Sequence, residues 1–221
     1  MKTLLLALCL TTISHGEGIV LSSPSDYQVI QRKTKSLGEI TVSGSLLDLH
    51  GTPVDVETRV IGQGKTGDWH RLVSATRKTA FCGTMELPAG GWYRMEARAL
   101  RGGKVVAEAA TEHFGIGEVF VVAGQSNSAN HGEEKQVPQT GLVTAFDGQR
   151  WQPAHDPQPG ASGEGGSFIP PLGDALAERL KVPMGFIPCG IGSTSVREWL
   201  PKGTAMPNPP TLTGRVEQLP D

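Results

Sequence analysis

The 221-residue sequence has few cysteines, few aromatic residues and little net charge. It contains 3 cysteines and 5% aromatic residues, and its formal net charge is -2. Such a charge gives no electrostatic basis for binding nucleic acid or an anionic membrane. No apolar run reaches bilayer-spanning length, and no cysteine–histidine spacing is typical of a zinc site. We therefore expect an ordinary globular chain with no metal, no cofactor, no nucleic-acid partner and no membrane partner.

The few cysteines limit the covalent links that can hold the fold together. Cys9 belongs to an N-terminal segment that we expect to be removed, which leaves Cys82 and Cys189 in different predicted domains. An oxidising compartment would permit a disulfide between them. Because the two residues fall on separate predicted strands, two buried free thiols are the favoured interpretation, and the disulfide is the alternative.

The N-terminus has the features of an export signal. Lys2 supplies a positive charge, an apolar stretch follows, and Ser14-His15-Gly16 places small residues at a cleavage site. We expect residues 1–16 to be a signal peptide and the mature chain to be exported, to the periplasm or the extracellular space. A lipobox ending at Cys9 is disfavoured, because Leu8 stands where a small residue is needed.

Residues 17–114 have the pattern of an all-β domain. Short segments alternate polar and apolar residues and recur at about ten-residue intervals, separated by turns rich in Gly and Pro. This pattern predicts a β-sandwich of the immunoglobulin-like type. A sugar-stacking platform formed by Trp69, Trp92 and Tyr93 is one interpretation of its aromatic residues, although packing in the core is commoner.

The pattern changes after Gly115, where an apolar run at 119–123 predicts a buried parallel strand. The strand ends at Gly124 and leads into Gln125-Ser126-Asn127 and an expected helix. A serine at the carboxyl end of such a strand exposes its hydroxyl, and its own N–H lies near a helix N-terminus, which suits a nucleophile. The alternative is an ordinary turn in which Ser126 or Asn127 caps the helix.

One further β–α–β unit is predicted downstream. A stretch at 132–170 rich in Gly, Pro, Gln and Ser precedes a helix at 171–181 and a strand at 183–189. Loops as long as that stretch are usually functional or disordered. The expected fold class is thus an N-terminal all-β sandwich at 17–114 followed by a partial α/β parallel-sheet domain at 115–221.

Three blocks occur in order along the second half. They are Gly124-Gln125-Ser126-Asn127, then Gly165-Gly166-Ser167-Phe168 with the helix that follows, and then the segment 182–201 with its loop at 190–195. Together they resemble the SGNH hydrolases, specifically the sialate O-acetylesterase-like branch of carbohydrate esterases. The resemblance covers about residues 115–201, and it implies an SGNH-type parallel sheet.

The resemblance implies a serine esterase that removes acetyl groups from a carbohydrate. It implies Ser126 as the nucleophile, and the backbone N–H groups of Ser126 and Gly166 as oxyanion donors. The other residues expected in the oxyanion or substrate pocket are Gln125, Asn127 and Gly192. A flexible linker without a role is the alternative interpretation of residues 160–166.

The sequence offers no clear general base for such an enzyme. The family's Asp-x-x-His and Gln-Gly-Glu-type blocks are both absent. His131 would point away from Ser126 if both lie on one helix, and His155 lies in the long loop as a further candidate. We therefore expect a truncated catalytic domain with low activity, whose last strand leaves an unpaired edge.

Two other functions are alternatives. The principal one is a non-catalytic secreted sandwich that binds a carbohydrate or a protein partner. A phosphate-binding loop at 190–194 is weaker, because no lysine follows it and no third glycine completes a dinucleotide motif.

Overall fold

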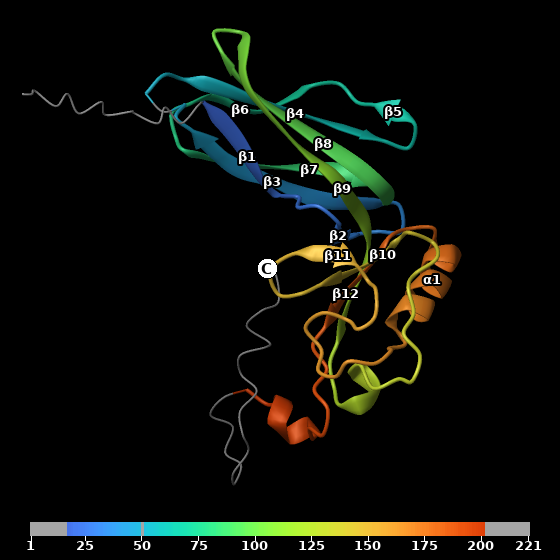
Figure 1. Ribbon diagram of the computed structural model, residues 1–221. Coiled ribbons are helices and arrows are strands. Elements are labelled where there is room, and N and C mark those ends of the chain that lie inside the picture. Colours follow the sequence, from blue (N-terminus) through green and yellow to red (C-terminus); the bar gives the residue numbers. More distant parts are fainter. Residues whose placement is uncertain (1–16, 50, 202–221) are drawn as a thin grey trace, which may run out of the picture.

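The computed structural model describes residues 17–49 and 51–201, so the predicted signal peptide lies outside the described residues. Within them the chain forms two β-sheets, one α-helix and two short 3-10 turns (Figure 1). The elements are β1 (Gly18–Ser23), β2 (Gln28–Gln31), β3 (Leu37–Leu47), β4 (Val54–Gly62), β5 (Lys65–Thr66), β6 (His70–Thr76), β7 (Ala80–Pro88), β8 (Gly90–Arg101), β9 (Lys104–Val122), η1 (Ser126–Ser128), β10 (Val143–Phe146), β11 (Trp151–Pro153), α1 (Ile169–Leu180), β12 (Met184–Pro188) and η2 (Val196–Trp199).

The upper half of the molecule in Figure 1 consists of two sheets that share a core. The three-stranded sheet β1-β3-β7 is antiparallel, and its inward-facing side chains pack against those of β4 and β8. Burial alternates along β3, where Ile40, Val42 and Leu46 face inward, and along β8, where Met95 and Ala97 do. The period-two pattern of the sequence therefore builds two packed sheets from residues 18–114.

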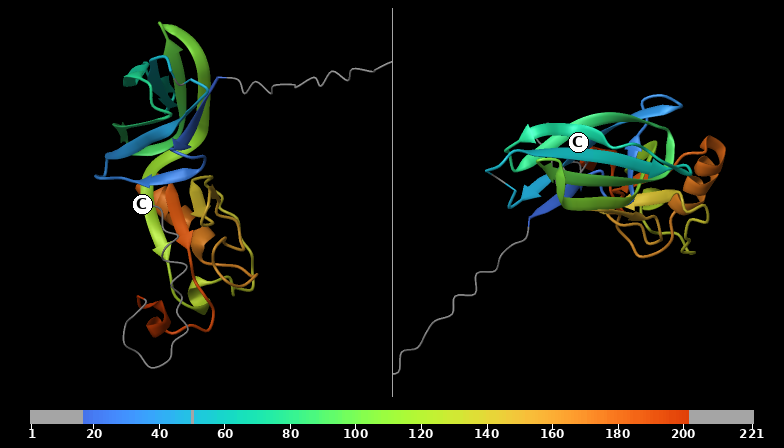
Figure 2. Two further views of the ribbon diagram at one scale, coloured as in Figure 1. Left: turned by 90° about the vertical axis from the view of Figure 1, so that its left-hand side faces the viewer. Right: turned by 90° about the horizontal axis from the view of Figure 1, so that it is seen from above.

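Strand β9 connects this half to the lower one. Its first part pairs antiparallel with β8, and its last part runs parallel to β12, from Glu118 opposite Met184 to Val122 opposite Pro188. The whole second sheet has the order β11-β10-β12-β9-β8-β4-β5, with β2 and β6 pairing to β9 and β4. Figure 2 (left) shows β9 running without interruption from the sandwich strands into the lower half.

The predicted fold class is wrong. Among the described residues there is no separate parallel α/β domain: β10, β12 and the end of β9 run parallel, but they extend a mixed sheet that also contains β8 and β4. The segment after Gly124 is a three-residue 3-10 turn instead of a helix. The stretch at 132–170, expected to be one long loop, contains β10 and β11.

Gly115, where the sequence pattern changes, and Gly117 are close-packing positions inside β9. Gly115 and Gly117 are both buried. A Cβ atom on Gly115 would lie 2.6 Å from Cγ of Pro183, and one on Gly117 would collide with the Pro183 carbonyl. Glycine within a strand often marks such a close approach of another backbone. β9 therefore continues across residue 115, and the division into 17–114 and 115–221 stays a prediction.

Helix α1 and strand β12 confirm the sequence-based expectations within a few residues. The helix packs on β10 and β12 through a buried stripe that includes Ile169, Gly173 and Ala177. Its Asp174 carboxylate accepts hydrogen bonds from the backbone of Gln139 and from the hydroxyl of Thr140, at 2.8 and 2.6 Å. The helix thereby also anchors the chain that leads into β10.

The two cysteines of the described chain form no disulfide with each other. Cys189 is buried, as expected, but Cys82 is exposed, because it faces outward on β7 between the inward-facing Phe81 and Gly83. None of the described helices is both long and apolar enough to cross a membrane.

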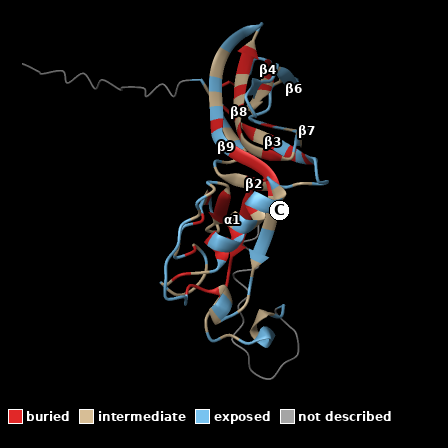
Figure 3. Cartoon of the chain, turned by 90° about the vertical axis from the view of Figure 1, so that its right-hand side faces the viewer, coloured by how far each residue is buried: buried red, intermediate tan, exposed pale blue. Residues whose placement is uncertain are grey.

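The end of β9 has one free edge. Beyond Gly117, and among the residues that the structure describes, β9 pairs with β12 alone. Phe120 and Val121 are 37% and 52% exposed, and the lower end of β9 is accordingly pale in Figure 3. The sequence predicted an unpaired edge on the last strand, but that strand, β12, pairs with β10 and β9 on its two sides, and the free edge lies on β9 instead.

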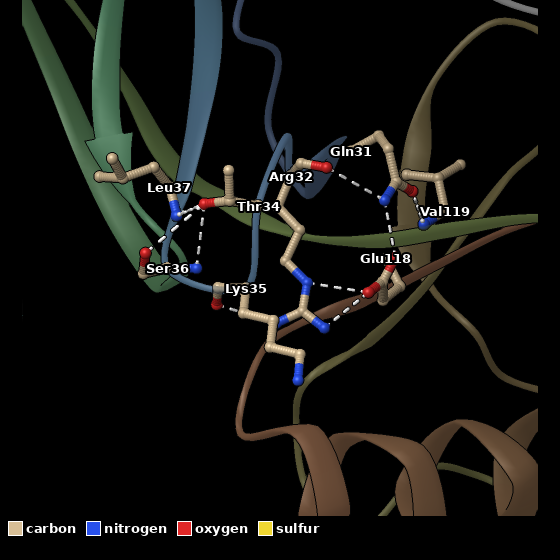
Figure 4. Close-up of polar contacts among 8 residues, drawn as sticks. All are labelled: Gln31, Arg32, Thr34, Lys35, Ser36, Leu37, Glu118 and Val119. Carbon is tan, nitrogen blue, oxygen red and sulfur yellow. Dashed lines mark hydrogen bonds and ion pairs between the residues drawn. The ribbon is translucent and has the colours of Figure 1, made fainter.

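A polar cluster from β2 joins the two halves where the free edge begins (Figure 4). The Arg32 guanidinium donates from Nε and Nη2 to the Glu118 carboxylate, at 2.8 and 2.6 Å. Gln31 donates to the other carboxylate oxygen at 2.6 Å, and its own side-chain oxygen accepts from the Val119 N–H at 2.8 Å. Burial alone would raise the pKa of Glu118, but these hydrogen bonds and the charge of Arg32 outweigh it and lower the pKa.

We expect Glu118→Gln to lower the free energy of unfolding by about 1–3 kcal/mol near pH 7, because Arg32 then loses its charged partner. The lowered pKa means that this contribution is complete above the unfolded value of 4.5 and is lost as the pH falls through the folded value. Urea unfolding of wild type and variant should therefore converge as the pH is lowered below about 4.5.

Glu39→Gln provides the matched control, because its pair with Lys33 is exposed on both sides, 41% and 55%. That variant should change the free energy of unfolding by less than about 1 kcal/mol at any of these pH values. An equal effect of the two variants would show that the Arg32–Glu118 pair does not hold the halves together.

Candidate active site

The carboxyl ends of β9 and β12 bring two of the three sequence blocks to one edge of the sheet. Val122 pairs with Pro188, so Gln125-Ser126-Asn127 and the loop at 190–195 both begin at this edge. The Cys189 N–H donates to the Val122 carbonyl at 2.9 Å, and the Ile191 N–H donates to the Gly124 carbonyl at 2.8 Å. The predicted meeting of these two loops is confirmed.

A single 3-10 turn presents Ser126. Gly124 has φ +136°, and a Cβ atom there would lie 2.8 Å from the Ser128 hydroxyl, so glycine suits the position on both counts. The Ser128 N–H donates to the Gln125 carbonyl at 2.7 Å, which closes the turn. No helix begins here for Ser126 or Asn127 to cap, so the capping interpretation is wrong.

The Ser126 hydroxyl is partly exposed and donates to the Gln125 side-chain oxygen at 2.8 Å. The Ser126 N–H precedes the first hydrogen bond of the turn and has no acceptor among the described residues. Asn127 beside it is exposed. The site therefore combines an accessible hydroxyl with an unused backbone donor on the same residue.

Backbone hydrogen bonds join the glycine-rich loop at 160–166 to the segment after Ser126 and to the loop at 190–195. Ser162 accepts from the Asn130 N–H and donates its own N–H to the Gly190 carbonyl, each at 2.8 Å. Gly166 forms a backbone bridge with Gly132. The interpretation of this stretch as a flexible linker is wrong, because its backbone is hydrogen-bonded on two sides.

Gly166 and Gly192 lie in this loop cluster, but their N–H groups are already used. The Gly166 N–H donates to the Gly132 carbonyl at 2.9 Å, and the Gly192 N–H donates to the Ser162 hydroxyl at 2.8 Å. A Cβ atom on Gly166 would collide with the Glu134 carbonyl. In this structure the two glycines shape the loops around Ser126 and offer it no free donor.

Asn130 is the residue of this cluster that sequence reasoning missed. Its side chain is 2% exposed, donates to the carbonyls of Gln158 and Gly163 at 2.9 and 3.4 Å, and accepts from the Gln158 N–H at 2.8 Å. Its backbone also binds Ser162 and Gly165. No spacing or periodicity in the sequence marks an asparagine whose partners lie at separations of 28 and 33 residues.

Of the two candidate histidines, His131 lies at the same edge of the sheet as Ser126. Its ring lies between the loops, with Nε2 2.7 Å and Cε1 3.2 Å from the positions that Cβ atoms on Gly192 and Gly163 would occupy. The expectation that its ring points away assumed a helix that does not form. No hydrogen bond joins His131 to Ser126 among the described residues.

His155 lies at the other end of the parallel strands. The N–H of the preceding Ala154 donates to the carbonyl of Val143, which pairs with Met184 at the start of β12. Pro188 is four residue steps after Met184, which is about 13 Å along the strand. His155 is therefore remote from Ser126 and is not a candidate base in this arrangement.

Two other sequence-based interpretations, the aromatic platform and the phosphate-binding loop, do not fit the structure. Tyr93 is buried, Trp92 donates from its indole to the Gly141 carbonyl, and the Trp69 ring packs against the Arg59 and Arg98 guanidinium groups, so the three form no shared platform. In the predicted phosphate loop the N–H groups of Ile191 and Gly192 are already bonded. The described chain contains no cluster of three or more metal-ligating side chains.

Comparison with known proteins supports the resemblance seen in the sequence. Residues 116–209 match the family model "Carbohydrate esterase, sialic acid-specific acetylesterase". No curated protein matches the chain. The second half of this chain is thus similar to carbohydrate esterases over a stretch that includes Ser126, Gly166 and Gly192.

Similar solved structures give only weak, partial likenesses. A glycosyl hydrolase family 2 member from Bacteroides cellulosilyticus is 21% identical, with a TM-score of 0.29, covering 43% of this chain and 14% of that one. The CARDB domain of the PF1109 protein from Pyrococcus furiosus, in complex with di-metal ions, is also 21% identical, with a TM-score of 0.25, covering 45% of this chain and 91% of that one.

We expect Asn130→Asp to lower the free energy of unfolding by about 2–4 kcal/mol, because a buried carboxylate would face two carbonyl oxygens and could donate to neither. Asn127→Asp makes the same chemical change at an exposed position and should cost less than about 0.5 kcal/mol. Thermal or urea unfolding measures both. Equal costs would mean that the Asn130 side chain does not hold its own loop against the segment 158–163.

Proposed function

We propose that the chain is a serine ester hydrolase that removes acetyl groups from carbohydrates, with Ser126 as its nucleophile. The observation that carries the proposal is the position of Ser126. Its hydroxyl and its unbonded N–H lie together at the carboxyl end of β9, inside the stretch that matches the carbohydrate esterase family. Open sheets bind their ligands at this edge.

The chemistry follows from these two groups. The Ser126 oxygen attacks the acetyl carbonyl carbon, and the negative charge that forms on the carbonyl oxygen is stabilised by the Ser126 N–H. Collapse of this intermediate breaks the bond to the sugar oxygen, which takes up the proton that Ser126 lost and leaves as a hydroxyl, and Ser126 remains acetylated. Water then cleaves that ester, which releases acetate and restores the hydroxyl. Gln125 and Asn127 flank the nucleophile, and Gly166 and Gly192 allow the loops around it to pack closely, because side chains there would meet the Glu134 carbonyl and the His131 ring.

The Ser126 hydroxyl is not hydrogen-bonded to any base of the described chain that could accept its proton. Its hydrogen-bond acceptor is the Gln125 amide oxygen, which is not a base at neutral pH. His131 is the histidine that the structure places at the same edge, and it supplies the base of the described site only if its ring turns toward Ser126. We therefore expect slow turnover from the arrangement as it stands.

We further propose that the protein acts outside the cytoplasm. The proposal rests on the N-terminal sequence, with its positive Lys2, its apolar stretch and its small residues at Ser14 and Gly16. An exported enzyme would meet acetylated polysaccharides directly.

Ser126→Ala should abolish hydrolysis of p-nitrophenyl acetate and of acetylated sugars by the 221-residue protein, because the attacking oxygen is gone. Ser128→Ala, in the same turn, is the matched control and should retain the wild-type rate. Release of nitrophenol and of acetate measures both. Equal rates in wild type and Ser126→Ala would overturn the assignment of the nucleophile.

A second pair of variants tests the base. His131→Gln should lower kcat by at least about a hundredfold if His131 serves as the base, whereas His155→Gln should leave it unchanged. Intact turnover in His131→Gln, with Ser126 still essential, would place the base outside the described residues.

A further inference from the structure

A second site lies in the upper half, away from Ser126. A cavity of about 590 Å³ opens between the two sheets, bounded by β4, β6 and β8 on one side and by β7 on the other. Its volume falls within the range of small-molecule sites, about 300–1,000 Å³. Neither the esterase chemistry nor the family match, which begins at residue 116, involves its residues.

The wall of the cavity is an uncovered part of the hydrophobic core. Val60, Leu72, Met85 and Leu87 all line it. They pack against the core cluster around Tyr93 but stay only partly buried. Because these side chains belong to the core and yet lack protein contacts on the cavity side, an apolar occupant would gain contacts that the protein itself does not supply.

One polar group in the cavity has no partner. Thr58 lines the cavity and is fully buried, and its Oγ1 makes no hydrogen bond within the described chain. Its neighbours on the same face of β4 are Val54 and Val56, so valine would suit the position if packing alone mattered. A buried hydroxyl without a partner is destabilising, and a ligand hydroxyl that pairs with it would recover that loss.

The mouth of the cavity is formed by the β4–β5 hairpin. Gln63 and Gly64 both have positive φ, 51° and 73°, as a two-residue turn of this type requires. The Gln63 amide donates to the Tyr93 hydroxyl at 2.8 Å, and that hydroxyl donates to the Pro88 carbonyl at 3.0 Å. Burial raises the pKa of Tyr93, so the phenol stays neutral. These two hydrogen bonds hold the hairpin beside the opening of the cavity.

Charges of both signs surround the opening and balance one another. Lys65 and Arg71 are cationic, and Asp68 and Glu86 are anionic. The Arg71 guanidinium is also engaged by Asp55 and Glu57. The lining therefore carries no excess of positive charge to attract an anionic head group, which favours an uncharged ligand over an anionic one.

We propose that this cavity binds an uncharged small molecule with an apolar body and a hydroxyl group. The apolar body lies against Val60, Leu72, Met85 and Leu87, and the hydroxyl pairs with Thr58 Oγ1. The site is independent of Ser126, so the proposal stands whether or not the esterase function holds.

The test uses the 221-residue protein and a fluorescent probe. N-phenyl-1-naphthylamine, which is neutral and brightens in apolar surroundings, should bind saturably with one site per chain. 1-Octanol should displace it, and octanoate should displace it at least about tenfold less well, because a carboxylate would lose its hydration without gaining a cation. Absence of saturable binding, or equal displacement by the alcohol and the acid, would overturn the proposal.

Three variants assign the site. Thr58→Val keeps the side-chain shape and should weaken octanol binding about three- to tenfold. Thr144→Val is the matched control, since Thr144 Oγ1 is also buried and unpartnered within the described chain but lies on β10, outside this cavity. Leu87→Trp should fill the cavity and abolish probe binding.

The outcomes are distinguishable from a folding defect. Thr58→Val removes an unpartnered hydroxyl and should melt at or above the wild-type temperature, so its weaker binding would not reflect unfolding. Unchanged octanol affinity in Thr58→Val, or probe binding that persists in a folded Leu87→Trp protein, would show that the ligand binds elsewhere.

Discussion

The close approach of Pro183 to β9 is the contact on which the rest of the structure depends. Gly115 and Gly117 leave no side chain in its way, so the chain entering β12 can lie directly against β9. β12 then pairs with β9 in one register, and that register delivers the loop after Pro188 to the edge where Ser126 lies. On the β2 side of the same strand, Gln31 and Arg32 bind Glu118. Contacts from both halves of the molecule therefore hold β9 at residues 115–118.

The site is therefore formed by three loops, and not by the end of a single strand. Residues near 126, 162 and 190 lie on different segments, and backbone hydrogen bonds through Asn130, Ser162 and Gly190 join them. The N–H groups of Gly166 and Gly192 serve that purpose. The Ser126 N–H is left unbonded within the described chain, so the site that the loops form is centred on the serine itself, with His131 on the same edge.

Local signals predicted the elements that have a clear period, and non-local contacts decided the rest. The helical pattern at 171–181 and the apolar run of β12 sufficed to place both elements, and chain direction then put Ser126 and the 190–195 loop on one edge. Gly115 suggests a boundary in the sequence because the residue that requires glycine there, Pro183, lies far along the chain. The turn after Gly124 is likewise too short for any periodicity to separate it from a helix.

Two buried polar side chains, those of Asn130 and Thr58, differ in whether the described chain supplies them with hydrogen-bond partners, and the difference follows from their surroundings. In the lower half, short strands and a single helix leave many backbone groups in loops, so a buried amide such as that of Asn130 is valuable for the partners that it satisfies. In the upper half, strand pairing already satisfies the backbone, and the Thr58 hydroxyl has no such role. A buried polar group that stabilises nothing within the described chain, beside a cavity lined by incompletely covered core residues, points to stabilisation by something from outside the chain.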